Sequence, residues 1–347
     1  MNWMIYGANG YTGRLMAEEA ARRGLKPILA GRNAAAIAPL AKQLDLPTRE
    51  FALDDPAALR AGLKDIDLVL HCAGPFSATC APMLEACLDA GAHYLDITGE
   101  IDVFAHCHAQ DARAKQRGIV VLPGAGFDVV PTDCLAAQLK RELPTASSLV
   151  LAFDAGGGPS PGTAKTAVEG FGSGGQVRVG GTLVRVPLAW KTRHFERDGE
   201  KRFAMTIPWG DVYTAYVSTG IPDIEVYMGV PPAMARNLRR IRWLGPVLGL
   251  SPVQALMKAM VARKVHGPSD SARSRSGSVV WGEVRDADGN EVKGQLQTPN
   301  GYALTVTAAL GIAQRLLTGD KPAGGYYTPS LLMGADYVLS LPGVSRR

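Results

Sequence analysis

Short apolar runs alternate with helix-length stretches through the first part of the chain, and this alternation constrains the fold most strongly. Strands separated by helices of this length form βαβ units, whose strands are parallel and whose crossovers are right-handed. The pattern predicts an α/β domain built on a Rossmann-type, doubly wound parallel sheet. The predicted strands are residues 4–8, 27–30, 48–53, 67–72, 94–97 and 119–122.

The sequence pattern changes after residue 122, where strand-like runs are separated by glycine and proline turns instead of helices. Two apolar runs flank Asp286-Ala287-Asp288-Gly289-Asn290, which is a hairpin signal. We expect a second α+β domain over 126–300, with a mixed, largely antiparallel sheet. The first domain should cover 1–125, with a closing helix at 302–318 and a tail to residue 347 packing back on it. The other strands predicted for the second domain are residues 149–154, 181–186, 203–208, 212–218 and 223–228.

A glycine-rich turn, Gly7-Ala8-Asn9-Gly10-Tyr11-Thr12-Gly13, links the first predicted strand to the first predicted helix. In dinucleotide-binding proteins such glycines allow the tight turn, the approach of the backbone to a pyrophosphate, and close packing of helix on strand. Free amides at the start of the helix then meet the phosphates. The spacing here is the GxxGxxG variant, so the strand-to-helix context matters as much as the glycines. The predicted cofactor contacts in this turn are Gly7, Asn9, Gly10, Tyr11, Thr12 and Gly13.

Arg32 and Asn33 end the second predicted strand, where an NAD-selective site usually places a carboxylate. An arginine suits a 2′-phosphate instead, so we expect NADP(H) as the cofactor, with Asn33 assisting. Asp54 follows the third strand and either borders the adenine or caps the next helix. The fourth strand leads into Ala73-Gly74-Pro75-Phe76, which we expect to form a rigid shelf near the nicotinamide ribose.

Hydride transfer leaves negative charge on the substrate, so a neighbouring group must supply a proton or stabilise that charge. Tyr94, on the fifth strand, and Asp128, in the loop after the sixth, are the candidate catalytic residues. Asp96 and Glu100 are weaker candidates, and Asp96 has the simpler interpretation of pinning a loop. No tyrosine is followed by lysine four residues later, which excludes the usual short-chain dehydrogenase mechanism.

The glycine- and proline-rich loop at 156–166 lacks the GK[ST] ending of a phosphate loop, which argues against nucleoside triphosphate chemistry. Thr163 and Lys165 are candidates for binding an anionic group of the substrate, and a lid or turn is the alternative. The histidines and cysteines lack a convincing metal-ligand pattern, so we expect no metal. No GxSxG elbow is present, which excludes the usual serine hydrolase.

Composition is that of a globular protein without a disulfide framework. Five cysteines are few and odd in number, and a net charge of +5 is too small to predict nucleic-acid binding. The sequence shows no signal peptide or spanning segment, so we expect a cytoplasmic location. Residues 233–266 interleave basic and apolar side chains, and two interpretations stay open. The segment either lies on an anionic membrane surface or forms helices that pack on the second domain or make a homodimer contact.

Together these motifs resemble the saccharopine dehydrogenase-like oxidoreductases, and the branch with the trans-acting enoyl reductases in particular. The segments that carry the resemblance are GANGYTG at 7–13, AGRN at 30–33, HCAGPF at 71–76, YLDITGE at 94–100, GFDVVPTD at 126–133, YTPS at 327–330 and VLSLPGV at 338–344. The resemblance implies a Rossmann domain, a second α+β domain inserted before the last helix, and NAD(P)-dependent redox chemistry. It does not name the substrate, because one fold serves many reactions.

We therefore expect an NADP(H)-dependent oxidoreductase that transfers hydride to or from a C=C or C=O of a small or lipid-like metabolite. Two alternatives stay open. An amino-acid-type dehydrogenase acting on a C–N bond would need a cluster of arginines for the substrate carboxylates. The other alternative is a non-catalytic NADP(H)-binding sensor or membrane-associated scaffold.

Overall fold

The computed structural model divides the chain into two compact units. Unit 1 comprises Met1–Asp128 and Leu304–Met333, and unit 2 comprises Val129–Ala303 and Gly334–Arg347. The structure describes the chain except for residues 157, 161, 165–166, 169, 171–173, 198, 245–246, 248, 266 and 320–321. Among the helices of the described residues, none is both long and apolar enough to cross a membrane.

Unit 1 is built on a seven-stranded sheet in the order β15-β6-β5-β4-β1-β2-β3, in which every neighbouring pair is parallel. Its strands are β1 (Trp3–Tyr6), β2 (Ile28–Gly31), β3 (Thr48–Glu50), β4 (Leu68–His71), β5 (His93–Asp96), β6 (Val120–Leu122) and β15 (Gly325–Tyr326). Its helices are α1 (Tyr11–Arg22), α2 (Ala34–Leu44), α3 (Pro56–Gly62), α4 (Phe76–Ala90), α5 (Ile101–Ala109), α6 (Asp111–Arg117), α14 (Gly301–Thr318) and α15 (Pro329–Met333). The predicted doubly wound parallel sheet is confirmed.

The sheet grows in both directions from β1, so its switch point lies between β1 and β4. All four residues of each of these strands are buried, as expected for strands covered on both faces. The register aligns Tyr6 with Ala30 on one side and with His71 on the other, and aligns His71 with Asp96. Ligands of doubly wound sheets bind at the carboxyl ends of such strands, near the switch point.

Local signals explain where the helices of unit 1 begin and end. The Asp55 side chain accepts hydrogen bonds from the amides of Ala57 and Ala58, and Pro56 takes the first helical position of α3, so Asp55 and not Asp54 caps this helix. The stretch between β5 and β6 forms two helices, α5 and α6, which meet at Gln110.

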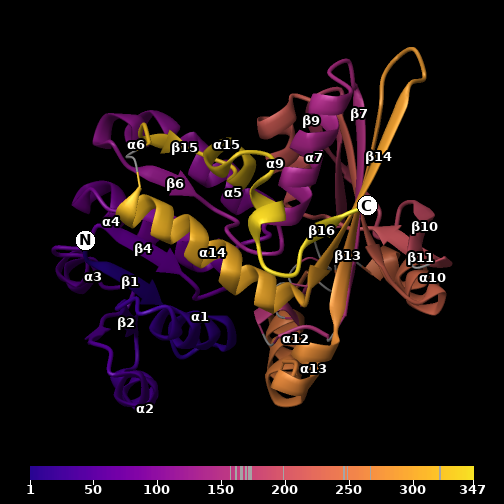
Figure 1. Ribbon diagram of the computed structural model, residues 1–347. Helices are drawn as coiled ribbons and strands as arrows, with labels where there is room; N and C mark the ends of the chain where they lie inside the picture. Colours follow the sequence, from indigo (N-terminus) through magenta and orange to yellow (C-terminus); the bar gives the residue numbers. More distant parts are fainter. Residues whose placement is uncertain are drawn as a thin grey trace. The chain divides into compact units, whose positions relative to one another are not determined.

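A late segment of the chain completes unit 1. After α14, strand β15 adds to the sheet edge by pairing with β6, and the Tyr326 amide donates to Asp111 Oδ1 at 2.8 Å. In Figure 1 the yellow strand β15 lies beside the purple strand β6, which comes much earlier in sequence.

Unit 2 contains a nine-stranded mixed sheet with the main order β10-β11-β12-β7-β13-β14-β16, while β8 pairs with β12 and β9. The β12–β7 pair is parallel and the other pairs are antiparallel, as expected for a mixed, largely antiparallel sheet. Its strands are β7 (Ser148–Ala155), β8 (Gly175–Val179), β9 (Thr182–Val186), β10 (Thr192–Arg197), β11 (Glu200–Thr206), β12 (Asp223–Gly229), β13 (Gly277–Arg285), β14 (Glu291–Pro299) and β16 (Ser345–Arg346). Its helices are α7 (Val130–Glu142), α9 (Asp211–Thr219), α10 (Pro232–Ile241), α12 (Ser251–Lys264), α13 (Asp270–Arg275) and the 3-10 turns η1 (Arg242–Leu244) and η2 (Tyr337–Ser340).

Helix α7 packs closely on the β13–β14 hairpin because two strand residues facing it are glycines. A Cβ at Gly282 would lie 2.5 Å from Leu139 Cδ1, and one at Gly294 would lie 3.0 Å from Leu135 Cδ1. Any side chain at these positions would push the helix away from the sheet.

Two expectations about unit 2 are wrong. Residues 212–218 were expected as a strand, yet they lie in helix α9, where Val212 and Ala215 are buried one turn apart. Burial of that helical face overrides the β-propensity of its valines and tyrosines. The tail was expected on the first domain, but from Gly334 it belongs to unit 2, where β16 pairs with β14.

Candidate functional site

The glycine-rich turn between β1 and α1 is held so tightly that side chains cannot replace its glycines. Gly7 has φ +85° and a Cβ there would lie 2.8 Å from Ala73. A Cβ on Gly13 would lie 2.2 Å from the carbonyl oxygen of Gly7, so this glycine allows α1 to pack on the turn. The α1 N-cap is Gly10, which makes no side-chain cap, and the first turn of α1 carries no acidic residue. This backbone fits a dinucleotide pyrophosphate, since it combines close approach with an N-terminus that favours anions.

Arg32 and Asp54 lie at the ends of neighbouring segments beside β1. Both are exposed, and both act electrostatically on the Tyr6 hydroxyl. That hydroxyl donates to Phe51 O at 3.0 Å, and burial raises the pKa of Tyr6 to about 12. The structure therefore brings Arg32, the residue predicted to bind the 2′-phosphate, and Asp54, the residue predicted to border the adenine, to one edge of the sheet.

The start of α2, next to Arg32, is capped by side chains. Asn33 Oδ1 accepts from the Ala36 amide at 3.1 Å, so the side-chain oxygen of this predicted cofactor residue caps the helix. Glu50 Oε1 accepts from the Ala34 amide at 3.0 Å, which places a carboxylate where the ribose of the cofactor is expected. Glu50 was not among the predicted site residues, because the predicted strand ran on to residue 53, whereas β3 ends at Glu50.

The predicted shelf at Ala73-Gly74-Pro75-Phe76 is held by hydrogen bonds from the Thr79 side chain. The Thr79 hydroxyl donates to the carbonyl oxygens of Ala73 and Pro75 at 2.7 and 3.1 Å. It therefore accepts from His71 Nε2, 3.0 Å away, which sets the histidine tautomer. Burial lowers the pKa of His71 to about 3, so the ring is neutral.

Glu100 joins this shelf to the end of β5. Its two carboxylate oxygens accept from the amides of Phe76 and Ser77 at 2.9 and 2.7 Å, so Glu100 caps the N-terminus of α4 from a distant part of the sequence. A negative charge at that helix terminus is favourable. The start of α4 is therefore already occupied by an anion, whereas the start of α1 has no side-chain cap.

Tyr94, which was predicted as a catalytic residue, lies in the core of the unit. Its side chain is fully buried, and its hydroxyl donates to Asp96 Oδ2 at 2.7 Å. Asp96 Oδ1 accepts from the amides of Thr98 and Gly124, both at 2.9 Å. Asp96 therefore pins two loops, as its simpler interpretation predicted, and Tyr94 supports it. A residue enclosed in this way touches no substrate.

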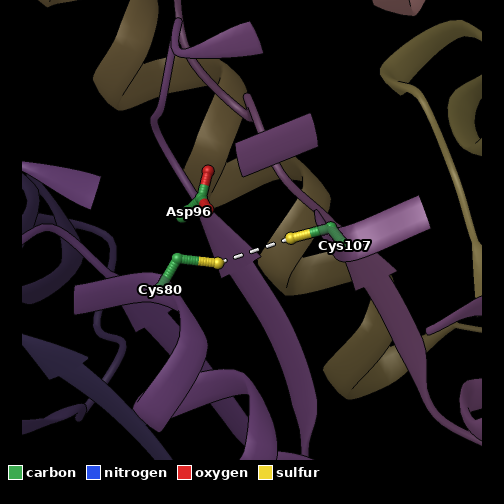
Figure 2. A group of neighbouring side chains, drawn as sticks. All are labelled: Cys80, Asp96 and Cys107. Carbon is green, nitrogen blue, oxygen red and sulfur yellow. Dashed lines mark hydrogen bonds between the residues drawn. The ribbon is translucent and has the colours of Figure 1, made fainter. Parts of the chain in front are cut away.

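Two cysteines lie beside this network. Figure 2 shows the sulfurs of Cys80 and Cys107 facing each other, 3.5 Å apart, with the Asp96 carboxylate nearby. The three residues have metal-ligand atoms within 4.8 Å of one another. Both Asp96 oxygens already accept hydrogen bonds, and burial raises the pKa of the Cys107 thiol well above its usual range. These features describe an internal hydrogen-bonded cluster.

Asp128 differs from Tyr94 in every respect that matters for catalysis. Its side chain is partly exposed, and its carboxyl packs on Gly99, where a Cβ would lie 3.1 Å from Oδ2. Burial, together with the negative charge of nearby Glu100, raises the pKa of Asp128 to about 7. The loop that carries Asp128 is fixed by α14, because the Phe127 amide donates to Thr305 Oγ1 at 2.9 Å. Asp128 is thus a carboxyl group that can hold or release a proton near neutral pH.

In unit 2, Thr163 belongs to a network of hydroxyl groups. Its amide donates to Ser160 Oγ at 3.2 Å, its hydroxyl lies 3.3 Å from the Tyr302 hydroxyl, and its side chain is exposed. The other predicted substrate residue, Lys165, lies outside the described residues. The network fixes the loop, and the exposed Thr163 is compatible with the predicted role.

Unit 2 also contains a cavity of about 680 Å³ whose walls include three arginines. Arg197 projects from β10 and donates to Asp154 at 2.9 Å, while Arg273 and Arg275 come from α13. Hydroxyl and amide side chains complete the polar lining: Ser276, Ser278, Gln297, Thr298 and Ser345. A cavity of this kind suits a ligand with anionic groups. The sequence alone could not place an arginine cluster of this kind, because its members come from distant segments.

Comparisons with known proteins agree with this geometry. Residues 3–122 match the family model described as the saccharopine dehydrogenase NADP binding domain. A mouse (Mus musculus) saccharopine dehydrogenase-like oxidoreductase is 27% identical over 201 residues, covering 50% of this chain and 47% of the mouse protein. The trans-acting enoyl reductase of Mycobacterium tuberculosis is 31% identical over 152 residues, which is 40% of this chain and 35% of that protein. The matched region thus spans about half the length of the mouse relative.

The fold likeness extends further than the sequence likeness. The structure of apo saccharopine dehydrogenase (L-Glu forming) from Saccharomyces cerevisiae superposes with a TM-score of 0.68, at 12% identity, over 100% of this chain and 99% of that chain. At this identity the likeness concerns the fold alone. The expected resemblance is confirmed: residues 3–122 match the saccharopine dehydrogenase NADP binding domain, and the curated relatives include saccharopine dehydrogenase-like oxidoreductases and a trans-acting enoyl reductase.

Proposed function

We propose that this protein is an NADP(H)-dependent oxidoreductase that transfers hydride to or from a C=C or C=O of a small or lipid-like metabolite. One observation carries the proposal. Asp128, whose pKa burial raises to about 7, lies with Gly99 and Glu100 at the carboxyl edge that also carries the glycine turn. A dinucleotide site and a group that exchanges a proton at neutral pH are the two parts that hydride transfer requires.

In this proposal each residue has a defined task. The bound cofactor supplies or accepts the hydride. The backbone of Gly7–Gly13 and the N-terminus of α1 bind its pyrophosphate, and Arg32 binds the 2′-phosphate. The shelf at 73–76, held by Thr79 and Glu100, supports the nicotinamide ribose. Asp128 gives a proton to the substrate atom that becomes negative, or removes it in the reverse direction.

Calorimetric titration of NADPH and NADH tests the cofactor part. We expect NADPH to bind at least tenfold more tightly, a difference of about 1.4 kcal/mol. Arg32→Asp should abolish that preference, while Arg60→Asp, at an exposed arginine on α3, should leave it intact. A preference for NADH in the wild type would contradict the assignment and would indicate that the Glu50 carboxylate binds the ribose hydroxyls. Binding of neither nucleotide would contradict the proposal as a whole.

Turnover distinguishes the enzyme from a sensor or scaffold. NADPH absorbance should fall with unsaturated or carbonyl substrates, including acyl-chain enoyl thioesters, and the fall should depend on Asp128. Tight NADPH binding without turnover on any carbonyl, enoyl or imine substrate would favour the non-catalytic alternative.

The arginine cavity favours one second candidate, an amino-acid-type dehydrogenase acting on a C–N bond. Arg273 and Arg275 would bind substrate carboxylates in that case. Oxidation of NADPH by 2-oxo acids, only in the presence of an amine, would support this candidate. Arg275→Ala should then raise KM for the acid while kcat changes little. Equal activity with uncharged carbonyl compounds would count against it.

A further inference from the structure

One stretch of unit 2 combines basic and apolar side chains without acidic ones. We call residues 232–264 the basic segment; it contains α10, η1 and α12. The sequence has no aspartate or glutamate from Val226 to Ser269. Over the basic segment it has seven lysines and arginines: Arg236, Arg239, Arg240, Arg242, Lys258, Arg263 and Lys264. Because all the charged side chains of this segment are positive, a surface that covers it should be anionic.

The basic segment also exposes large apolar side chains. Trp243 is 74% exposed, Leu256 63% and Leu250 54%, values far above those of core residues. Val247, Met260, Met234 and Ile241 are exposed as well. Leu256 and Met260 lie one turn apart on α12, and neighbouring exposed apolar groups mark a surface that binds something, whereas single exposed groups do not.

Helix α12 shows that this exposure is not incidental. Each of its side chains that the structure describes is partly or fully exposed, although half of its sequence is apolar. A helix of 14 residues gains little stability in water without a buried face. The helix therefore has an apolar surface that folding of this unit leaves uncovered.

Helix α10 is anchored on the unit and turns its charges outward. Ala235 and Leu238 are buried, and Arg239 donates to the Ala189 carbonyl at 2.8 Å. Arg236 and Arg240, one turn apart, are exposed and make no ion pair with any acid in the described part of the chain. One face of α10 thus holds the segment in place while its cations remain available.

We propose that the basic segment docks on an anionic lipid surface, with its arginines at the headgroups and Trp243, Leu250 and Leu256 inserted among the acyl chains. Segments that combine lysine or arginine with exposed tryptophan and leucine bind at the surface of a bilayer, with the cations at the headgroups and the apolar side chains at the acyl boundary. Anionic headgroups attract each nearby lysine or arginine, and a tryptophan ring favours the interface. The proposal does not depend on the enzymatic function.

A second copy of the chain fits this surface less well. In a two-fold dimer the same patch lies on both partners, so a dimer through the basic segment would bring arginines against arginines. No acidic residue within 226–269 is available to offset that repulsion. The charge of the segment therefore selects an anionic surface over its own copy.

Co-sedimentation of the full chain with vesicles tests the proposal. We expect binding to phosphatidylcholine vesicles that contain phosphatidylglycerol and little binding to phosphatidylcholine alone. Binding should weaken at high salt, because screening shortens the range of the attraction. Tryptophan emission should shift to the blue on binding, and Trp243→Phe should remove that shift.

Two pairs of substitutions separate the contribution of the charges to vesicle affinity from that of the apolar side chains. Arg240→Glu with Arg242→Glu should lower vesicle affinity at least about tenfold, and Trp243→Ser with Leu256→Ser should do the same. The matched controls are Arg60→Glu and Leu331→Ser, which change exposed residues of unit 1 and should leave affinity unchanged. NADPH titration of every variant checks that unit 1 still folds.

Two results would overturn the proposal. One is failure of the wild type to sediment with anionic vesicles at low salt. The other is a concentration-dependent dimer, detected by light scattering, that Leu256→Ser dissociates while vesicle affinity is unchanged. Either outcome can occur with normal NADPH binding and turnover, so neither bears on the proposed function.

Discussion

Asp96 and Asp128 are two acids of the same unit whose pKa values burial raises, to about 6 and about 7, yet they do different things. Asp96 is fully buried and accepts hydrogen bonds from Thr98, Gly124 and Tyr94. Asp128 is partly exposed and packs against Gly99 beside Glu100.

The difference teaches that a perturbed pKa does not by itself identify a catalytic group. In Asp96 the hydrogen-bond donors oppose the effect of burial, and they use the oxygens that a substrate would need. In Asp128 the neighbouring negative charge adds to the effect of burial, and part of the side chain stays accessible. The exposure of the side chain and the identity of its hydrogen-bond partners therefore distinguish Asp96, which has a structural role, from Asp128, which is the candidate for proton transfer.

The sharpest test of the comparison is Asp128→Asn. Because asparagine keeps the shape but cannot exchange the proton, we expect kcat to fall by roughly 10²–10⁴-fold. The melting temperature should change little. The control is Asp102→Asn, at an exposed acid on α5, which should keep full activity. Equal activity of the Asp128→Asn variant and the wild type would remove Asp128 from the mechanism.

Asp96→Ala should show the opposite pattern. It leaves two backbone amides and the Tyr94 hydroxyl buried without their acceptor, so we expect a loss of roughly 3–5 kcal/mol in the free energy of unfolding. Urea unfolding followed by circular dichroism measures that loss. At low temperature, where the variant is still folded, its kcat should stay within a few-fold of the wild type. A large fall in kcat with unchanged stability would break the comparison.

Tyr94→Phe is the milder change in the same network. It removes one hydrogen bond to Asp96, so we expect a cost of about 1–2 kcal/mol in stability. Turnover should be unaffected across the pH range, since the hydroxyl is enclosed in the core. Loss of turnover in a variant of normal stability would restore Tyr94 as a catalytic candidate.

The pH dependence of stability gives the most specific effect. The folded protein keeps a proton on Asp128 up to about pH 7, whereas the ordinary carboxyl value is 3.8, so the folded state binds more protons in that window. Stability should therefore fall as pH rises from about 4 to about 7. Asp96 contributes in the same direction, so the relevant quantity is the difference between the wild type and Asp128→Asn. Parallel curves for the two proteins would show that the pKa of Asp128 is not raised.

Much of unit 1 could be predicted because its signals are local. The strand-to-helix glycine turn, the Asp55-Pro56 helix start and the alternation of strands and helices act over a few residues. Helix α9 could not be predicted in this way, since its valines and tyrosines favour a strand until a buried helical face is available.

The site was predictable only in part, for the same reason. Gly7, Gly13 and Arg32 follow from position along the chain. The cap that Glu100 places on α4 and the contact between Asp128 and Gly99 depend on side chains from distant segments. The sequence places Tyr94 on the fifth strand, but it does not show whether the side chain is exposed. That exposure depends on the distant segments that pack over both faces and the end of the strand.

The pairing of β15 with β6 sets an order of events during synthesis. The three residues of β6 are fully buried in the finished unit, but their partner strand begins at Gly325. At 5–20 residues per second, a ribosome needs roughly 10–40 s to pass from one to the other. Throughout that time the apolar edge of β6 lacks this partner strand and is open to unwanted pairing. The finished sheet therefore conceals an interval during synthesis in which the edge of β6 has to wait for β15.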